Sequence, residues 1–271
     1  MLAALALVGF HGQVLSCCMP SMSGFANDPA FAAAHERPLP FKFQSSEGKD
    51  VTFIAGDGSK ANGYFVAGKS KVAIVMIQEF WGLNDYIKQQ AVQMEQKTGY
   101  SVLAPDMYDG KVATDAATAS KYMQDADPNR LTSIVEGAVK TITAGPLAHA
   151  VKVGTIGWCF GGGWSLQAAI HGGPWVKACV MYYGMPDDDQ SHLATLDAPV
   201  LLVEANKDKW ISPEVVGKFE AAMKQAGKKL TVRRYDEDHA FANPSNPHYG
   251  RADAEDAMNA TLHFYHRYLG E

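Results

Sequence analysis

The sequence predicts an α/β fold, built on a mostly parallel, doubly wound sheet with helices on both faces. Two observations predict it. From residue 50 onward, short apolar runs alternate with segments of helical pattern. One apolar run also leads directly into Gly157-Trp158-Cys159-Phe160-Gly161, a cysteine framed by glycines, and helix-forming residues follow. Near-continuous apolar runs indicate strands that are covered on both faces.

The predicted elements follow in chain order. Residues 50–55 and 61–67 predict an entry hairpin around Gly56-Asp57-Gly58, and Gly99 predicts the end of a helix. Pro128 suits the first turn of another helix. The later strands are expected at 71–78, 100–104, 151–156, 176–183, 198–204 and 230–235. Helices are expected at 85–97, 114–124, 128–143, directly after Cys159, 213–226 and 252–268.

Composition bounds the kind of protein. The 271 residues are 47% hydrophobic and 20% charged, which is typical of a globular chain with a sizeable core. A net charge of -5 argues against nucleic acid as a partner. We expect a monomer.

The first residues differ in character from the rest. Leu2 to Phe10 is a nine-residue apolar run, too short to span a bilayer but long enough for the core of a secretory signal. No Lys or Arg precedes Arg37, so the usual basic start is missing. Val14-Leu15-Ser16-Cys17 resembles a bacterial lipobox, although leucine in its second place departs from the pattern. The alternative is a disordered or packed N-terminal arm.

This gives three segments. Residues 1–18 are interpreted as a signal or lipoprotein leader, residues 19–45 as a Pro-rich tether, and residues 46–271 as the folded domain. We therefore expect an exported protein, periplasmic or attached to the membrane through a lipidated Cys17. Cys179 lies in an apolar strand and reads as an inert core residue, so Cys159 is expected to be a free thiol.

The glycine-framed cysteine has the form of a nucleophile elbow. Such a turn between strand and helix holds the nucleophile clear of the sheet, and the next backbone N–H can meet a developing oxyanion. A cysteine nucleophile needs a base and a group that orients the base. His239 follows the strand 230–235, and Asp208 follows the strand 198–204, so both lie at strand carboxyl ends. The order nucleophile, acid, histidine is that of the α/β-hydrolase fold.

Each of these residues also has a purely structural reading. Cys159 could be a small buried cysteine in a Gly-rich turn, Asp208 a surface-loop acid, and His239 a turn histidine. The three in this order favour the catalytic reading. The donors of the oxyanion hole are then the backbone N–H of Phe160 and an N–H from the loop after strand 71–78, with Phe80 as the candidate.

Five segments together resemble the dienelactone hydrolase family over roughly residues 50–270. They are Gln78-Glu79-Phe80-Trp81-Gly82-Leu83-Asn84, Ala104-Pro105-Asp106-Met107-Tyr108, Gly157 to Gly162, the Asp208 loop, and His239-Ala240-Phe241. The resemblance implies an α/β hydrolase without a large cap domain that cleaves a lactone or small ester through a cysteine. It implies a triad of Cys159, Asp208 and His239, with Glu79 controlling protonation of the cysteine and no cofactor.

The substrate-binding residues depart from the family pattern. Arginines that hold the substrate carboxylate in dienelactone hydrolases are missing from the neighbourhoods Tyr108 to Lys111 and Phe241 to Pro244. Lys111 and Arg251 are the candidate cations in their place, and Trp81 is a candidate apolar wall. Lysine lacks the bidentate fork of arginine, so neutral substrates are expected to be accepted at least as well as anionic ones.

Two other functions are kept open. The first is a catalytically silent, exported scaffold that binds a small molecule, and the second is a thiol redox enzyme that uses Cys159. A resolving cysteine near Cys159 is not evident, which counts against the second. His263 and His266 share one helix face, but this pair alone does not predict a metal site, and none is expected.

Overall fold

The computed structural model describes residues 22–270, and its centre is an eight-stranded sheet with the order β1-β2-β4-β3-β5-β6-β7-β8. β1 pairs antiparallel with β2, and β2 antiparallel with β4; all later neighbours are parallel. The strands are β1 (Gly48–Ile54), β2 (Lys60–Val66), β3 (Val72–Ile77), β4 (Ser101–Pro105), β5 (Lys152–Trp158), β6 (Val176–Tyr182), β7 (Val200–Ala205) and β8 (Leu230–Tyr235).

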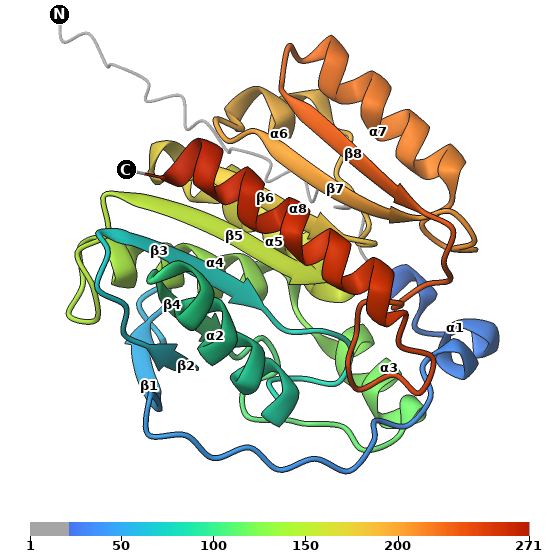
Figure 1. Cartoon of the computed structure of the whole chain (residues 1–271), viewed down its shortest axis with the longest axis horizontal. Coiled ribbons are helices and arrows are strands. Elements are labelled where there is room, and N and C mark those ends of the chain that lie inside the picture. The colour runs from blue at the N-terminus through green and yellow to red at the C-terminus, as the bar shows by residue number, and fades with distance from the viewer. Residues whose placement is uncertain (1–21, 271) are drawn as a thin grey trace, which may run out of the picture.

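Helices cover both faces of this sheet, with α2 and α8 in front and α4 and α5 behind in Figure 1. The helices after the entry hairpin are α2 (Asp85–Thr98), α3 (Ala116–Asp125), α4 (Pro128–Thr143), α5 (Phe160–His171), η2 (Gly173–Trp175), α6 (Gln190–Thr195), α7 (Pro213–Gln225) and α8 (Arg251–Leu269). Every residue of β3, β4 and β7 is buried, as the continuous apolar runs predict. The predicted α/β class and mostly parallel sheet are confirmed.

A glycine ends one helix and a proline begins another at the positions that the sequence predicts. Gly99 ends α2 in the left-handed region, with φ of 69°, and its N–H donates to the carbonyl of Glu95. Pro128 occupies the first turn of α4, where its missing N–H costs no hydrogen bond. The short helices α6 and η2 are not predicted, because six and three residues are too few to show a helical period.

The largest difference from the sequence interpretation lies before the domain. Residues 22–43, which we call the N-terminal arm, fall within the expected tether, yet they pack on the folded domain. The arm contains η1 (Met22–Phe25) and α1 (Pro29–Ala34), and Met22 and Phe31 are fully buried. In Figure 1, α1 lies at the edge toward which the arrows of β3 and β5 point.

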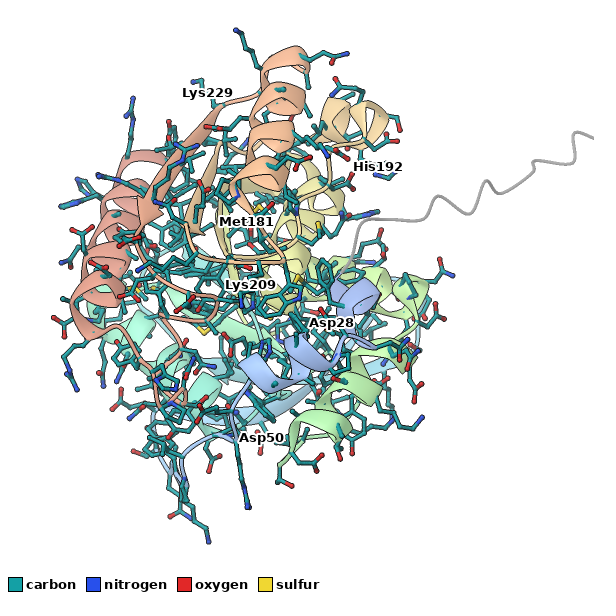
Figure 2. The ribbon with its side chains drawn as sticks, turned by 90° about the vertical axis from the view of Figure 1, so that its right-hand side faces the viewer. Asp28, Asp50, Met181, His192, Lys209 and Lys229 are labelled. Atoms are coloured by element: carbon teal, nitrogen blue, oxygen red, sulfur yellow. The ribbon has the colours of Figure 1, made fainter. Side chains whose placement is uncertain are left out.

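Polar contacts fix the arm at several places. The indole N–H of Trp210 donates to Asp28 at 2.8 Å, and the N–H of Leu39 donates to the carbonyl of Ser245 at 3.3 Å. Figure 2, seen from the strand-end side, shows α1 crossing this face, with Asp28 and Lys209 labelled close to it. The expected leader, with Cys17, lies outside the described residues. Among residues 22–270, no helix is long and apolar enough to cross a membrane.

Candidate active site

Cys159 stands at the sharp turn between β5 and α5. Its backbone has φ of 54°, a conformation that a non-glycine residue adopts only when its surroundings enforce it. A Cβ atom on Gly157 would collide with the carbonyl of Gly161, and one on Gly161 would collide with the carbonyl of Gln78. The two framing glycines are therefore required for the strand and the helix to approach this closely.

The surroundings of Cys159 favour the neutral thiol. Burial raises its pKa well above the ordinary value, and the charge of Glu79 adds to the effect. The backbone N–H of Phe160, the first residue of α5, acts in the opposite direction. This amide therefore lies next to the sulfur, at the place where an oxyanion donor is expected.

Asp208 and His239 form a short, buried polar contact at this edge. Nδ1 of His239 lies 2.5 Å from Oδ2 of Asp208, and both side chains are buried. Burial opposes ionisation of Asp208, but His239 and the N–H groups of Ile211 and Trp210 lower its pKa below the usual value. The ionised carboxylate can only accept, so Nδ1 of His239 donates, and in the neutral ring Nε2 is then the nitrogen with the lone pair. That Nε2 atom is buried and has no hydrogen-bond partner.

Glu79 lies two residues after the end of β3 and is also buried. Burial raises its pKa to about 8, and the hydroxyl of Tyr183 opposes this. Asn243 donates its side-chain N–H to Oε2 of Glu79. Sequence reasoning treats residue 243 only as a place where an arginine is missing, so this contact emerges from the fold alone.

Aromatic rings enclose the sulfur and the histidine. The ring of Tyr183 lies edge-on to His239, with centroids 5.2 Å apart, and burial raises the pKa of its hydroxyl, which the charges of Glu79 and Cys159 raise further. Phe80 and Trp81 are buried and pack against each other at 5.1 Å. Trp81 is thus a buried core residue that packs on Phe80.

The N-terminal arm supplies a residue that sequence reasoning did not single out. His35, directly after α1, is 4% exposed, and its Nε2 lies 3.5 Å from the sulfur of Cys159. Its ring packs on Phe80 at 4.3 Å and lies 5.2 Å from the ring of His239. Burial lowers the pKa of His35 to about 3, so the ring is neutral. A histidine in a Pro-rich segment carries no spacing signal that could have identified it.

The two candidate cations of the substrate site have surface partners. Lys111 is exposed, and its ammonium lies 5.6 Å from the centre of the Tyr122 ring. Arg251, the first residue of α8, has a side chain that is 79% exposed and lies 3.8 Å from Glu255. It lines a hollow of about 360 Å³ between α2 and α8, whose lining includes Trp158 but not Cys159.

The fold and this edge of the sheet define a class. A parallel sheet, a strained elbow after β5, an acid after β7 and a histidine after β8 form the framework of the α/β hydrolases. The family model of the dienelactone hydrolase family matches residues 62–269, so the chain belongs to that family. This confirms the family that the motifs resemble and the predicted class of enzyme, a hydrolase of ester or lactone bonds.

Individual relatives agree with this assignment. A protein named usf from Aquifex pyrophilus is 29% identical over 79% of this chain and 96% of its own length. A putative carboxymethylenebutenolidase of Aquifex aeolicus is 25% identical over the same shares. The crystal structure of a putative dienelactone hydrolase from Klebsiella pneumoniae has a TM-score of 0.70 at 22% identity, covering 81% of this chain and 100% of that one. The family match begins at residue 62, so α1 and His35 lie outside it.

Proposed function

We propose that this chain hydrolyses small neutral esters or lactones, with Cys159 as the nucleophile, His239 as the general base and Asp208 as the group that orients His239. One observation carries the proposal. Nδ1 of His239 contacts Asp208, so Nε2, which has no hydrogen-bond partner, is the nitrogen left to take the proton of Cys159; the cysteine is held at a strained elbow, and one ligand nitrogen of His239 lies within 4.8 Å of its sulfur.

The first half of the reaction forms an acyl-enzyme. Nε2 of His239 takes the thiol proton while the sulfur attacks the carbonyl carbon, and the π electrons of the carbonyl move to its oxygen. The N–H of Phe160 and that of Phe80 are the proposed donors to this oxyanion. When the intermediate collapses, the ester C–O bond breaks, and the leaving oxygen takes the proton from His239.

The second half uses water. His239 removes a proton from a water molecule that attacks the thioester carbon, and the thiolate then leaves and is reprotonated by His239. In a lactone the leaving hydroxyl stays attached to the acyl chain, so the product is one hydroxy acid. Asp208 stabilises the imidazolium that forms in each half.

The resting site is closed and its thiol is neutral. Cys159 is 0% exposed, and the rings of His35 and Phe80 pack together beside it. Substrate therefore reaches the sulfur only when α1 shifts. A protonated, covered thiol is also poorly reactive toward oxidants, because the thiolate is the species that they attack.

The test is hydrolysis of a neutral aryl ester and of a simple lactone by the wild type and by Cys159→Ala and Cys159→Ser. We expect Cys159→Ala to lose at least about 10³-fold in kcat/KM with its fold intact, because the attacking atom is gone and little volume changes. Cys159→Ser should stay far below the wild type. Turnover by Cys159→Ala close to that of the wild type would exclude the mechanism.

A further inference from the structure

Three side chains that can bind metal converge behind α1, although they come from distant parts of the chain. Ligand atoms of His35, Cys159 and His239 all lie within 4.8 Å of one another, and all three residues are buried. Nε2 of His35 lies 3.5 Å from the sulfur. In a tetrahedral zinc site, with Zn–S about 2.3 Å and Zn–N about 2.0–2.1 Å, a sulfur and a nitrogen ligand stand about 3.5 Å apart. The distance between Nε2 of His35 and the sulfur of Cys159 therefore already matches that between two ligand atoms of such a site.

Both histidines have the tautomer that a metal requires. The carbonyl of Phe31 accepts from Nδ1 of His35 at 2.8 Å, and the carboxylate of Asp208 accepts from Nδ1 of His239 at 2.5 Å. In the neutral rings, Nε2 is therefore the nitrogen that carries the lone pair. Fixing the remote ring nitrogen with a carbonyl or carboxylate is the usual outer-shell support of histidine ligands. Nε2 of His239, in a side chain that is 2% exposed, has no other partner.

The charges around the cluster suit a cation. Among the described residues, the buried ionisable side chains include Glu79 and Asp208 but no Lys or Arg. The charge of Asp208 acts on the sulfur of Cys159. Two imidazoles and a thiolate are ligands that zinc prefers over magnesium or calcium.

We propose that Cys159, His35 and His239 bind a zinc-class divalent cation, with water as the fourth ligand, and that this cation pins α1 over the sulfur and stops hydrolysis. On binding, the S–H bond is replaced by a metal–sulfur bond and one proton is released, with no change of oxidation state. The inhibitory half rests on the proposed function, whereas the binding half does not. No metal is predicted from the sequence, because His35 and Cys159 are 124 positions apart and form no spacing motif.

Co²⁺ is the spectroscopic probe, because it binds in place of zinc and gives a thiolate-to-metal charge-transfer band. The full chain should carry Cys17→Ser and Cys18→Ser, so that leader thiols contribute nothing to this band. We expect one Co²⁺ per chain, a charge-transfer band, and displacement of the band by stoichiometric Zn²⁺. Cys159→Ser should abolish the band. Absence of the band in the parent chain would overturn the proposal.

The arm ligand is tested by His35→Gln, with His248→Gln as the matched control. His248 also contacts the arm, through Glu36 at 2.9 Å, but its side chain is 78% exposed and outside the cluster. We expect His35→Gln to weaken Zn²⁺ binding at least about 10-fold, as loss of metal-site support does elsewhere. His248→Gln should bind like the parent chain. Equal affinity of His35→Gln and the parent, in chains that melt cooperatively, would overturn the three-residue site.

Hydrolysis is measured separately on the same chains. Zn²⁺ should inhibit the parent at the concentration at which it binds, and His35→Gln should require at least about 10-fold more. If no ester or lactone is cleaved but Zn²⁺ binds through the three residues, the proposed function fails and the metal site stands. If hydrolysis occurs and saturating Zn²⁺ leaves its rate unchanged, the inhibitory half fails.

Discussion

At the scale of single residues, the proposed mechanism has Asp208 act on the chemistry only through His239. Its carboxylate receives Nδ1–H of His239 and the N–H groups of Trp210 and Ile211, so it is held in place from several sides. Under the proposed mechanism it orients the ring and stabilises the imidazolium, while His239 carries the proton. Removing the base should therefore cost more than neutralising its partner.

We expect His239→Ala to lose at least about 10³-fold in kcat/KM and Asp208→Asn about 10²- to 10⁴-fold, with the smaller loss for Asp208→Asn. The measurement is the steady-state rate on a neutral aryl ester. Glu204→Gln is a control on a buried acid within β7, whose partner Arg234 lies 2.8 Å away at the surface. A larger effect from Asp208→Asn than from His239→Ala would contradict the assigned roles.

Substrate charge is also decided by single residues. Lys111 faces Tyr122, and Arg251 faces Glu255, so neither candidate cation is arranged to give a substrate carboxylate the charge-assisted hydrogen bonds that each contribute about 1.5–3 kcal/mol. We expect kcat/KM for a neutral lactone to equal or exceed that for an anionic dienelactone at moderate salt. Lys111→Ala should change the neutral rate less than about 2-fold. A strong preference for the anion that Lys111→Ala or Arg251→Ala removes would show a rebuilt carboxylate site.

At the scale of elements, α1 is a six-residue helix that cannot hold itself on the protein by helix propensity. Its place depends on Phe31, which is fully buried against Phe80 and Trp210 with ring centroids 5.6 and 5.2 Å away. Burying one such side chain contributes about 1.5–3 kcal/mol. Burial of this one side chain is thus enough to favour the closed position of α1 by roughly 10- to 100-fold.

Phe31→Ala should therefore open the site. We expect iodoacetamide to alkylate Cys159 about 10-fold faster or more in this variant, since each 1.4 kcal/mol of lost closure is a factor of ten in the open population. Mass spectrometry of the peptide with Cys159 separates it from the other thiols. Phe41→Ala, which removes an arm ring stacked on Tyr86 at 4.5 Å, is the control. An unchanged alkylation rate in Phe31→Ala would mean that α1 does not limit access.

At the scale of the whole molecule, Glu79 links stability to pH. Its pKa rises from an ordinary 4.5 to about 8 because it is buried. The fold therefore favours the neutral form. This contribution to stability is complete below about pH 4.5 and is lost as pH rises through about 8.

Glu79→Gln should flatten this dependence, because glutamine stays neutral and can still accept from Asn243. We expect the wild type to lose on the order of a few kcal/mol of unfolding free energy from this group between those two pH values, and the variant to lose correspondingly less. The measurement is urea denaturation at several pH values. Parallel stability profiles for the two chains would contradict a neutral, buried Glu79.

The sequence by itself determined the order of strands and helices, the hairpin, and the elbow around Cys159. These features depend on neighbours in the chain: apolar runs, glycines where a Cβ would collide, and a proline in a first turn. It also placed Asp208 and His239 at one sheet edge, because parallel strands bring their carboxyl ends together.

Only the tertiary structure decided what lies against the sulfur. His35 reaches Cys159 across 124 positions, and Asn243 reaches Glu79 across 164. The arm reads as a tether because six helical residues and a few prolines carry no period, and its order comes from burying Phe31 in a hollow that other segments build. Contacts of this kind depend on shape complementarity between distant segments. Local sequence pattern therefore predicts the strands and turns that carry Cys159, Asp208 and His239. The cover that α1 forms over the site, and the position of His35 beside the sulfur, follow only from tertiary packing.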